Sequence, residues 1–477
     1  MSLKPRAIFL LFIVILTEGY IVLSTELLAI RQTIPFVGSG TDTISIIIAA
    51  VLMPLAFGYY NGGKFKPHYQ GRRFLTVRSK LLQNILVSSV FLILAISYVP
   101  LFLFFTLLIQ NGIYYRLLLT GLYATIFLVT PVYLLGQTIP LVSNFFSKER
   151  LSENTGRMLF FSTIGSFLGA VLSTIILMAT IGVHHTASLT FLLLAAIYLL
   201  LRKDRNLERN LPILCIAGMG LVFNSSSVME NLHIVENNQY NTIMVTEDPQ
   251  THSRTISLNN NSSSTLHADG RPHEYIHFIE KHYINPLPAE DAPKRILVIG
   301  AGGFTLGLQD TKNIYDFVDI DGSLKEVSEK YFLQKQLGPN KHFYPSPARA
   351  FLIQNKNDYD LIVLDAYFGG VNIPEHLVTQ DFFKQIRETL TKGGTVVANF
   401  IVHPNFSDRF SQHIDTTFRS VFPFITRQMI EDYNGQSIHH DRQSNILYIY
   451  QDQDFATPQK VYTDNLNTIF LDKPQKR

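Results

Sequence analysis

The sequence has 477 residues, of which 47% are hydrophobic and only 16% charged, and its mean hydropathy is +0.16. This composition excludes a disordered chain and a nucleic-acid-coating protein, and it is too apolar for an ordinary soluble enzyme. Residues 1–223 hold 17 Lys and Arg against 7 Asp and Glu, whereas residues 224–477 hold 23 against 30. A basic, apolar first part followed by an acidic, mixed second part predicts a membrane domain joined to a water-soluble domain.

Residues 1–228 predict a multi-span α-helical membrane domain. A transmembrane helix needs about 20 mostly apolar residues, and six segments meet this requirement: 8–30, 43–62, 81–109, 117–145, 157–182 and 185–201. Segment 211–228 is a weaker seventh candidate, because it is short enough to be an interfacial or re-entrant helix. Whether it spans decides on which side of the membrane the second half lies, and the sequence leaves both arrangements open.

Lys and Arg gather before the first span and after the second, fourth and sixth spans. The positive-inside rule therefore places the N-terminus and these loops in the cytoplasm, and we expect a multi-pass protein of a bacterial inner (plasma) membrane. Glu18 and Glu26 lie inside the first span, either as a site for a cation or proton or as structural partners of Arg31 and nearby hydroxyls. Gly165 and Gly169 have the spacing of closely packed helices.

Residues 230–292 predict a small β-rich segment. Alternating strands are expected at 243–245 and 255–258, with the polar run 259–265 as a connecting loop and a helix at 274–283. The single cysteine, Cys215, excludes an internal disulfide and a cysteine-based metal cluster.

Strands and helices alternate from residue 293 to residue 455, and residues 456–477 are expected to form a C-terminal tail. The alternation predicts an α/β domain with a Rossmann-like, methyltransferase-type fold. Its expected strands are 295–299, 316–321, 359–365, 395–401, 422–430 and 445–450, with helices at 323–337 and 382–391.

Three features follow strands of this domain, and ligands of such sheets bind at the carboxyl ends of the strands. A glycine turn with Gly300, Gly302 and Gly303 comes after the first strand. Asp319 lies 17 residues beyond Gly302, close to the spacing of a carboxylate that holds ribose hydroxyls, and Asp365 ends the next strand. These features predict a nucleoside-type ligand site, the alternative being a retained fold with an inactive pocket.

Several short stretches carry a resemblance to one known family: 26–31, 36–39, 156–157, 164–169, 238–243, 272–274, 298–306, 318–321, 359–365 and 373–379. On these residues the chain resembles the spermidine synthase (polyamine aminopropyltransferase) family and, more closely, its membrane-fused branch. The resemblance implies transfer of an aminopropyl group from decarboxylated S-adenosylmethionine to an amine, without a metal.

The resemblance also implies roles for individual residues. It makes Asp365 the general base, and it places His273 and Tyr240 at the amine. The residues that it assigns to the donor are Gly300, Gly302, Gly303, Asp319, Asp321, Asn241 and Pro374.

The chain departs from the family pattern at several pocket positions. The glycine loop 300–305 has no acid, Phe368 replaces a second acid, and Pro347 replaces an adenine-binding aspartate. Asn241 stands where the family has glutamine. The resemblance implies a polyamine or a membrane-associated amine as the acceptor. Fewer carboxylates attract a diamine less, so these departures instead favour a monoamine, an amine on a lipid or peptide, or an uncharged group. Phe304 and Phe368 either make the pocket apolar or pack in the core.

Three other functions stay open at this point: an S-adenosylmethionine-dependent methyltransferase, a transporter with a regulatory soluble domain, and a non-catalytic binding protein. The expected partners are the lipid bilayer and a small amine or lipid-amine substrate, with no nucleic acid. The β-rich segment matches the oligomerisation region of the family, so the resemblance implies a homodimer. His439 and His440 have no further ligand nearby in the sequence and are read as an exposed pair rather than a metal site.

Overall fold

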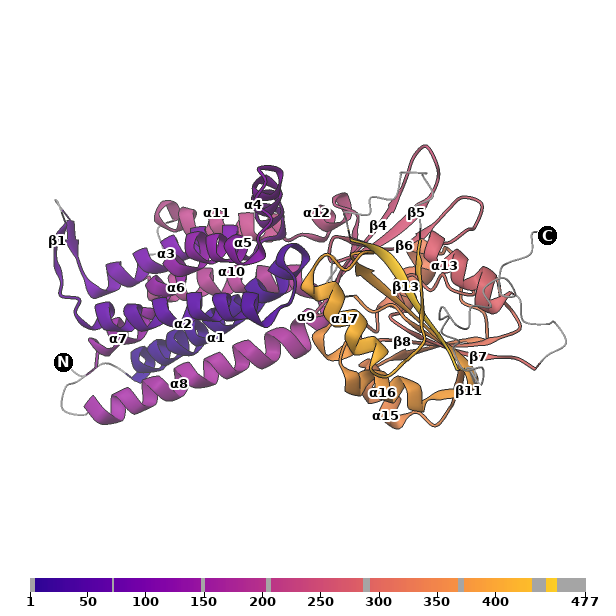
Figure 1. Ribbon diagram of the computed structural model, residues 1–477. Coiled ribbons are helices and arrows are strands. Elements are labelled where there is room, and N and C mark those ends of the chain that lie inside the picture. Colours follow the sequence, from indigo (N-terminus) through magenta and orange to yellow (C-terminus); the bar gives the residue numbers. More distant parts are fainter. Residues whose placement is uncertain are drawn as a thin grey trace, which may run out of the picture.

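The computed structural model describes residues 5–70, 73–146, 151–202, 207–285, 292–367, 373–430 and 443–452. A helical bundle forms the N-terminal half and a sheet-containing domain the C-terminal half, and the two lie end to end (Figure 1). Phe368, His439, His440 and the predicted tail 456–477 lie outside the described residues.

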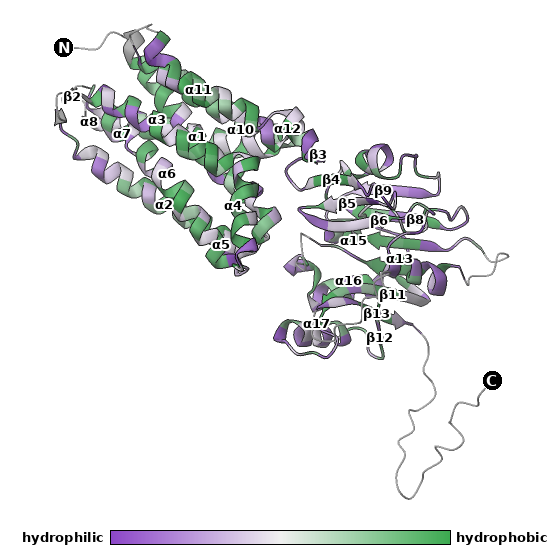
Figure 2. Ribbon diagram, turned by 90° about the horizontal axis from the view of Figure 1, so that it is seen from above, coloured by the Kyte–Doolittle hydropathy of each residue, from purple (hydrophilic) through white to green (hydrophobic). Residues whose placement is uncertain are grey.

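Six helical segments of the described chain are long and apolar enough to cross a membrane: Ile8–Val37, Thr41–Gly63, Val77–Ile96, Arg116–Ser143, Ser152–Thr180 and Gly182–Leu201. Hydrophobic residues dominate the helices of this bundle, whereas the C-terminal half is mixed (Figure 2), and most of the exposed large hydrophobic side chains belong to the bundle. The chain is therefore a multi-pass membrane protein, as its hydropathy predicts.

The bundle is built from the following elements: α1 (Pro5–Val37), α2 (Thr41–Gly63), α3 (Val77–Ile96), α4 (Tyr98–Gln110), α5 (Arg116–Tyr123), α6 (Val129–Gly136), α7 (Thr138–Ser143), α8 (Leu151–Val171), α9 (Met178–Thr180), α10 (Gly182–Leu201), α11 (Leu207–Phe223) and α12 (Ser226–Asn231). Short π-helical turns continue α5 into α6 (η1, Ala124–Leu128) and α8 into α9 (η3, Leu172–Leu177). A small hairpin of β1 (His68–Gln70) and β2 (Arg73–Leu75) joins α2 to α3 at the end of the bundle away from the C-terminal half (Figure 1).

The predicted third span, 81–109, is wrong. Helix α3 ends before Ser97, whose backbone is extended and whose hydroxyl accepts a hydrogen bond from Asn224, and α4 starts afresh after it. Helix α4 leaves Leu103 and Leu107 about 60% exposed, and two exposed tyrosines follow it. This pattern is typical of a helix at the membrane–water interface.

Helices α1 and α8 approach each other with glycines at the contact. A Cβ atom on Gly165 would lie 2.0 Å from the main-chain oxygen of Leu16, and one on Gly169 would lie 2.4 Å from that of Tyr20. Gly19 of α1 has the same relation to Ser162 of α8. The small residues let the two backbones touch, as the glycine spacing predicts.

We therefore expect Gly165→Leu to lower the apparent melting temperature of the purified protein in detergent by about 6 °C or more. The added side chain would meet the backbone of α1, which cannot move aside as a flexible side chain can. Gly156→Leu is the matched control, because it lies on the same helix and a Cβ atom there would have no neighbour within 4 Å. Equal melting temperatures for the two variants would contradict the close packing of α1 and α8.

Arg31, near the C-terminal end of α1, does not pair with the glutamates of its own helix. Among the described residues it makes no ion pair with Glu18 or Glu26, and its hydrogen bonds go to residues 237, 238 and 242 of the C-terminal half. The interpretation of Arg31 as an intrahelical partner is therefore wrong. Its contacts join the membrane bundle to the rest of the chain.

Four antiparallel strands, in the order β3-β4-β5-β6, come directly after the bundle. They are β3 (Ile234–Asn237), β4 (Thr242–Glu247), β5 (Arg254–Leu258) and β6 (Asn261–Leu266). The prediction of a connecting loop at 259–265 is wrong, because Asn259 and Asn260 make the turn, both with positive φ, and β6 follows at once. Polar strand residues carry no apolar alternation, so hydropathy hid this strand.

The larger sheet has seven strands in the order β12-β13-β11-β10-β7-β8-β9. Strand β13 runs in the direction opposite to the other six. The seven strands are β7 (Arg295–Ile299), β8 (Ile314–Asp319), β9 (Lys341–Pro345), β10 (Tyr359–Leu364), β11 (Leu390–Val402), β12 (Thr426–Met429) and β13 (Ser444–Gln451). This is the sheet of the methyltransferase-type Rossmann-like fold, as predicted from the alternation of elements.

Helices cover both faces of this sheet. One face packs on the small sheet and on α13 (Glu274–Ile279), its continuation η4 (Glu280–Ile284), α14 (Leu324–Val327) and η5 (Ser328–Phe332). The other packs on α15 (Ala348–Gln354), α16 (Gln380–Glu388) and α17 (Arg409–Arg419). The predicted helix 323–337 ends earlier, at Phe332, and the sequence patterns did not reveal β9, α15 and α17.

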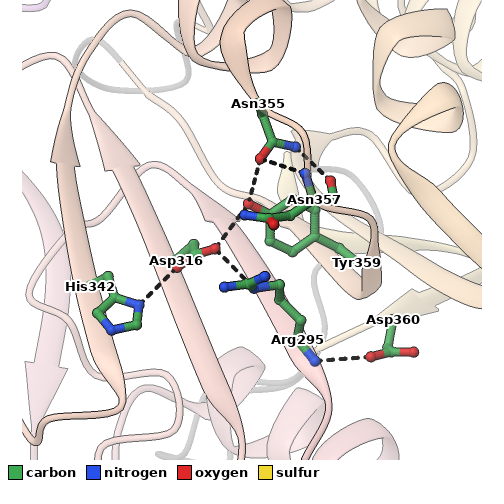
Figure 3. Close-up of polar contacts among 7 residues, drawn as sticks. All are labelled: Arg295, Asp316, His342, Asn355, Asn357, Tyr359 and Asp360. Carbon is green, nitrogen blue, oxygen red and sulfur yellow. Dashed lines mark hydrogen bonds and ion pairs between the residues drawn. The ribbon is translucent and has the colours of Figure 1, made fainter.

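A buried polar cluster lies at the amino ends of the parallel strands (Figure 3). The fully buried Asp316 carboxylate pairs with His342 at 3.1 Å and with Arg295 at 3.4 Å, and it accepts a hydrogen bond from Tyr359 at 3.0 Å. Three partners compensate the loss of hydration of this carboxylate. The cluster ties four neighbouring strands together, β10, β7, β8 and β9, at the edge opposite the glycine turn, so it is structural.

Candidate active site

A pocket lies at the carboxyl ends of the parallel strands, where the sheet meets the small antiparallel sheet. It brings together predicted site residues that are far apart in the sequence: His273, Gly300, Gly302, Asp319, Asp365 and Pro374. Side chains of β6, α13 and β11 complete its wall. The chain thus forms one concave site that contains two strand-end carboxylates, Asp319 and Asp365.

Asp365 follows β10 directly and is held by two neutral donors. The hydroxyl of Tyr275 donates to Oδ2 at 2.5 Å, and the side-chain amide of Asn399 donates to Oδ1 at 3.0 Å. Burial raises the pKa of Asp365 to about 6, although both hydrogen bonds act to lower it. A carboxylate in this state takes up a proton more readily than an exposed one, as a general base requires.

Asp319 ends β8 on the other side of the glycine turn. Its carboxylate accepts hydrogen bonds from the main-chain nitrogens of Ala301 and Asp321, each at 3.0 Å. Burial is the main reason that the pKa of Asp319 is raised to about 6. The main-chain donors orient both oxygens toward the pocket wall, and each oxygen keeps a lone pair for a ligand hydroxyl.

The glycine turn lets β7 approach β10 closely. Gly300 has φ +94°, and a Cβ there would lie 2.2 Å from the main-chain oxygen of Asp365. A Cβ on Gly302 would lie 2.8 Å from the Ser264 hydroxyl. At Gly300 only glycine fits, because φ is positive and the main chain of Asp365 leaves no room, whereas at Gly302 a side chain would have to adopt positive φ (+50°) and displace the Ser264 hydroxyl.

Four predicted site residues do not line the pocket. The main-chain nitrogen of Gly303 donates to Ser264, and a Cβ there would meet the ring of Phe332. Asn241 and Asp321 bind each other at 2.8 Å beneath the pocket. Tyr240 donates its main-chain nitrogen to Asn238 and also lies outside the lining. Because these four residues are not among the described lining residues, their predicted contacts with a ligand stay predictions.

Two of the departures from the family pattern, Phe304 and Pro347, occupy different places in the structure. Phe304 is fully buried at φ +59°, in edge contact with Phe317 and Phe343, so it belongs to the core and does not make the pocket apolar. Pro347 does line the pocket, next to Ser346 and Ala348. The segment 346–348 after β9 therefore contributes no carboxylate to the described lining.

The sequence patterns did not point to the residues that hold Asp365 or to those of β6. Asn399 is a polar residue inside the apolar run 396–400, and Tyr275 follows His273 by two positions, so both carried a recognisable signal. Ser262 and Ser263 line the pocket from β6, which was expected to be a loop. Among the described residues, no group of three or more His, Cys, Asp or Glu side chains is arranged to hold a metal ion.

Comparison with known proteins agrees with this site. Residues 277–432 match the model of the spermine/spermidine synthase domain. The C-terminal part of this chain is a spermidine synthase-type domain. The resemblance expected from the sequence motifs is thereby confirmed, with the apolar helices of the bundle preceding the domain in a membrane-fused arrangement.

The synthase-type domain has relatives among curated bacterial proteins. A polyamine aminopropyltransferase of Vibrio vulnificus is 34% identical over 137 residues, which cover 27% of this chain and 44% of that protein. One of Alkaliphilus oremlandii is 32% identical over 131 residues, which cover 25% and 45%. The chain thus spans less than half the length of these two relatives. The crystal structure of spermidine synthase from Thermotoga maritima covers 48% of this chain and 80% of that one, at 16% identity and a TM-score of 0.36.

Proposed function

We propose that the synthase-type domain transfers an aminopropyl group from decarboxylated S-adenosylmethionine to an amine, with Asp365 as the general base. The proposal rests on the observation that one pocket contains both Asp319 and Asp365, which flank the glycine turn. Asp319, with lone pairs toward the pocket, holds the ribose hydroxyls of the donor. His273, from the loop before α13, lines the wall on the acceptor side, and Pro374 borders the pocket near the donor.

The reaction needs a base but no metal. The nitrogen of the acceptor attacks the methylene carbon attached to the sulfonium, the carbon–sulfur bond breaks with its electrons going to sulfur, and methylthioadenosine leaves. An ammonium has no lone pair, so Asp365 first accepts a proton from it. Tyr275 and Asn399 hold the carboxylate in place for this step.

The lining favours the decarboxylated donor over S-adenosylmethionine. No Lys or Arg occurs among the described residues that line the pocket. The carboxylate of S-adenosylmethionine would therefore lack a cationic partner there, and an unpaired charge in such a site is costly. The methyltransferase alternative has no comparable support.

The acceptor is an amine with one ammonium group near Asp365 rather than a diamine. Asp319 and Asp365 are the only carboxylates among the described lining residues, and Asp319 serves the donor. Away from Asp365 the wall consists of neutral groups such as Ser262, Ser263 and Leu258. A second ammonium would find no opposite charge there, whereas an apolar or hydroxyl-bearing tail would be accommodated.

The test is a product assay on the full chain in lipid nanodiscs. Each adenosyl donor is supplied separately with diamines, monoamines and an amine-containing lipid, and the products are identified by mass spectrometry. Methylthioadenosine together with an acceptor heavier by one aminopropyl group supports the proposal. S-adenosylhomocysteine would assign the domain to methyl transfer, and neither product with any acceptor would refute catalysis.

The arrangement of the bundle also supports a membrane orientation. Helix α11 packs beside α10 and α3 and runs back toward the synthase-type domain (Figure 1), and its 17 residues rise about 25 Å. Leu211 and Val222 on its surface are more than half exposed, as lipid-facing residues are. With α11 as a seventh crossing, the end of α2, the start of α3 and the end of α10 lie at the end opposite the synthase-type domain, and the described basic residues in or next to these helix ends are Lys64, Lys66, Arg78, Lys80 and Arg202. By the positive-inside rule the N-terminus is cytoplasmic and this domain lies on the other side.

This orientation predicts the labelling of two single-cysteine variants made in a Cys215→Ser background. Thr251→Cys lies on an exposed loop of the small sheet, and Lys66→Cys lies on the exposed segment after α2. In spheroplasts a membrane-impermeant maleimide is expected to label the first variant and to label the second only after lysis. The reverse pattern would place the synthase-type domain in the cytoplasm and refute the orientation.

A further inference from the structure

A buried arginine of the membrane bundle reaches the small sheet. Arg31 of α1 is 4% exposed, and its Nε donates to the main-chain oxygen of Asn238 at 2.7 Å. Its Nη2 donates to the side chains of Asn237 at 3.3 Å and Thr242 at 3.2 Å. All three acceptors belong to the end of β3, the start of β4 and the turn between them, so one guanidinium holds this turn against the membrane helix.

The same turn holds a buried carboxylate below the pocket. The Asn238 amide donates to Asp321 Oδ1 at 2.9 Å, and the Asn241 amide donates to Asp321 Oδ2 at 2.8 Å. Asp321 is 1% exposed and is attracted electrostatically by Arg31. Ser323, on the same loop, also donates to Oδ1, from its main-chain nitrogen at 3.1 Å and its hydroxyl at 2.7 Å. The two amides and the nearby guanidinium add to this local support from outside the Rossmann-like sheet, and together these groups compensate the burial of the carboxylate.

Asp321 in turn shapes the position of Asp319. The main-chain nitrogen of Asp321 donates to Asp319 Oδ1 at 3.0 Å, while Asp319 Oδ2 accepts from the glycine turn at Ala301. An unbroken series of hydrogen bonds and covalent linkages thus runs from α1 through the β3–β4 turn to the carboxylate in the pocket. Its order is Arg31, Asn238, Asp321, Asp319.

We infer that Arg31 is a positioning residue for the donor site: the membrane helix α1 fixes, through Asn238 and Asp321, the orientation of the Asp319 carboxylate. The inference rests on the proposed function in taking Asp319 as the donor-binding carboxylate. Without Arg31 the buried acceptors at 237, 238 and 242 lose their donor, and an unsatisfied buried acceptor is costly enough to make the turn rearrange. Asp321 then loses the two amide donors of the turn and keeps only those of Ser323, so the loop that carries Asp319 loosens.

The first test measures donor affinity of the full chain in nanodiscs by calorimetry with decarboxylated S-adenosylmethionine. Arg31→Gln is expected to raise the Kd about tenfold or more, with kcat at saturating donor within about threefold of wild type and the KM for the acceptor unchanged. Arg31→Lys keeps a positive charge but not the several N–H donors of the guanidinium. Its donor Kd is therefore expected to lie between the values of wild type and Arg31→Gln. Equal Kd values for Arg31→Gln and wild type would overturn the inference.

Two controls separate positioning from general damage. Arg78→Gln removes an arginine of the same bundle whose Nε donates to the main-chain oxygen of Leu201, away from the synthase-type domain. Tyr98→Phe removes a hydrogen bond to Asn260 that also joins the two halves but is not on the path to Asp319. Both controls are expected to keep the donor Kd of wild type. Asn238→Ala combined with Arg31→Gln is expected to give less than the sum of the two single effects, because both act on one path.

Hydrogen–deuterium exchange tests the coupling without a ligand. Residues 314–323 are expected to exchange faster in Arg31→Gln than in wild type, while α17, on the far face of the sheet, stays unchanged. Faster exchange in a protein that binds neither adenosyl donor would support the coupling and refute the proposed function. Unchanged exchange would refute the coupling whether or not the domain is an enzyme. If Arg31→Gln does not fold, Asn238→Ala breaks the path from the soluble side by removing the amide that donates to Asp321, and the same two readouts apply.

Discussion

Asp365→Asn is expected to reduce kcat about 10³-fold while the Kd for the donor stays within about threefold of wild type. The substitution keeps the size of the side chain and a carbonyl oxygen that can still accept from Tyr275, but it removes the group that takes the proton from the ammonium. The measurement is methylthioadenosine formation at saturating donor, with donor binding by calorimetry alongside. Residual activity above a tenth of wild type would rule out Asp365 as the base.

Asp360→Asn is the matched control, since Asp360 lies on the same strand but at its other end, where it accepts from the main-chain nitrogen of Arg295. The pH profile of the wild-type protein gives an independent check. Because burial raises the pKa of Asp365 to about 6, the base becomes protonated as the pH falls through this value, so kcat/KM decreases below about pH 6 and levels off above it. Asp319 has a similar pKa, so the decrease is steeper than for one group.

Gly300→Ala is expected to lower kcat/KM more than 100-fold and to weaken donor binding to a similar extent. The added methyl would lie 2.2 Å from the main-chain oxygen of Asp365, so either the glycine turn or the end of β10 must move. Positive φ adds strain of about 1–2 kcal/mol. The two displaced segments are the ones that carry the donor site and the base.

Gly393→Ala separates the two causes, because Gly393 also has positive φ, at +80°, but a Cβ atom there would have no neighbour within 4 Å. This control is expected to lose stability by about 1 kcal/mol and to keep its activity. The readouts are kcat/KM, donor Kd and melting temperature for both variants. If both variants lose activity equally, conformational strain rather than the close approach to Asp365 explains the effect.

The class of each half of the fold could be predicted from local patterns. Long apolar runs marked the membrane helices, and the alternation of strands and helices marked the Rossmann-like domain, because burial in lipid or in a parallel sheet constrains every residue of such a segment. The errors fell where local pattern and tertiary contact differ. Ser97 interrupts the apolar run 81–109 through a partner that follows α11, and the serine-rich strand β6 is held by its neighbours rather than by hydropathy.

The residues of the candidate site divide in the same way, into those that local pattern could predict and those that depend on tertiary contacts. Gly300, Asp319 and Asp365 could be predicted because a strand end, a glycine turn and a fixed spacing are properties of the chain itself. The resemblance assigned Asp321 and Asn241 to the donor, and in the structure they bind each other and do not line the pocket. For Phe304 the sequence left a pocket position and a core position open, and the structure places its ring in the core against Phe317 and Phe343.

The amino-acid sequence by itself determined a membrane bundle, a Rossmann-like domain and two strand-end carboxylates, since these depend on periodicity and spacing along one stretch of chain. Only the tertiary structure decided which groups hold those carboxylates. Tyr275 and Asn399 reach Asp365 from 90 and 34 positions away, and Arg31 reaches Asn238 across 207. No local pattern encodes such pairs, because a buried polar group takes whatever partner the folded chain brings within hydrogen-bonding distance.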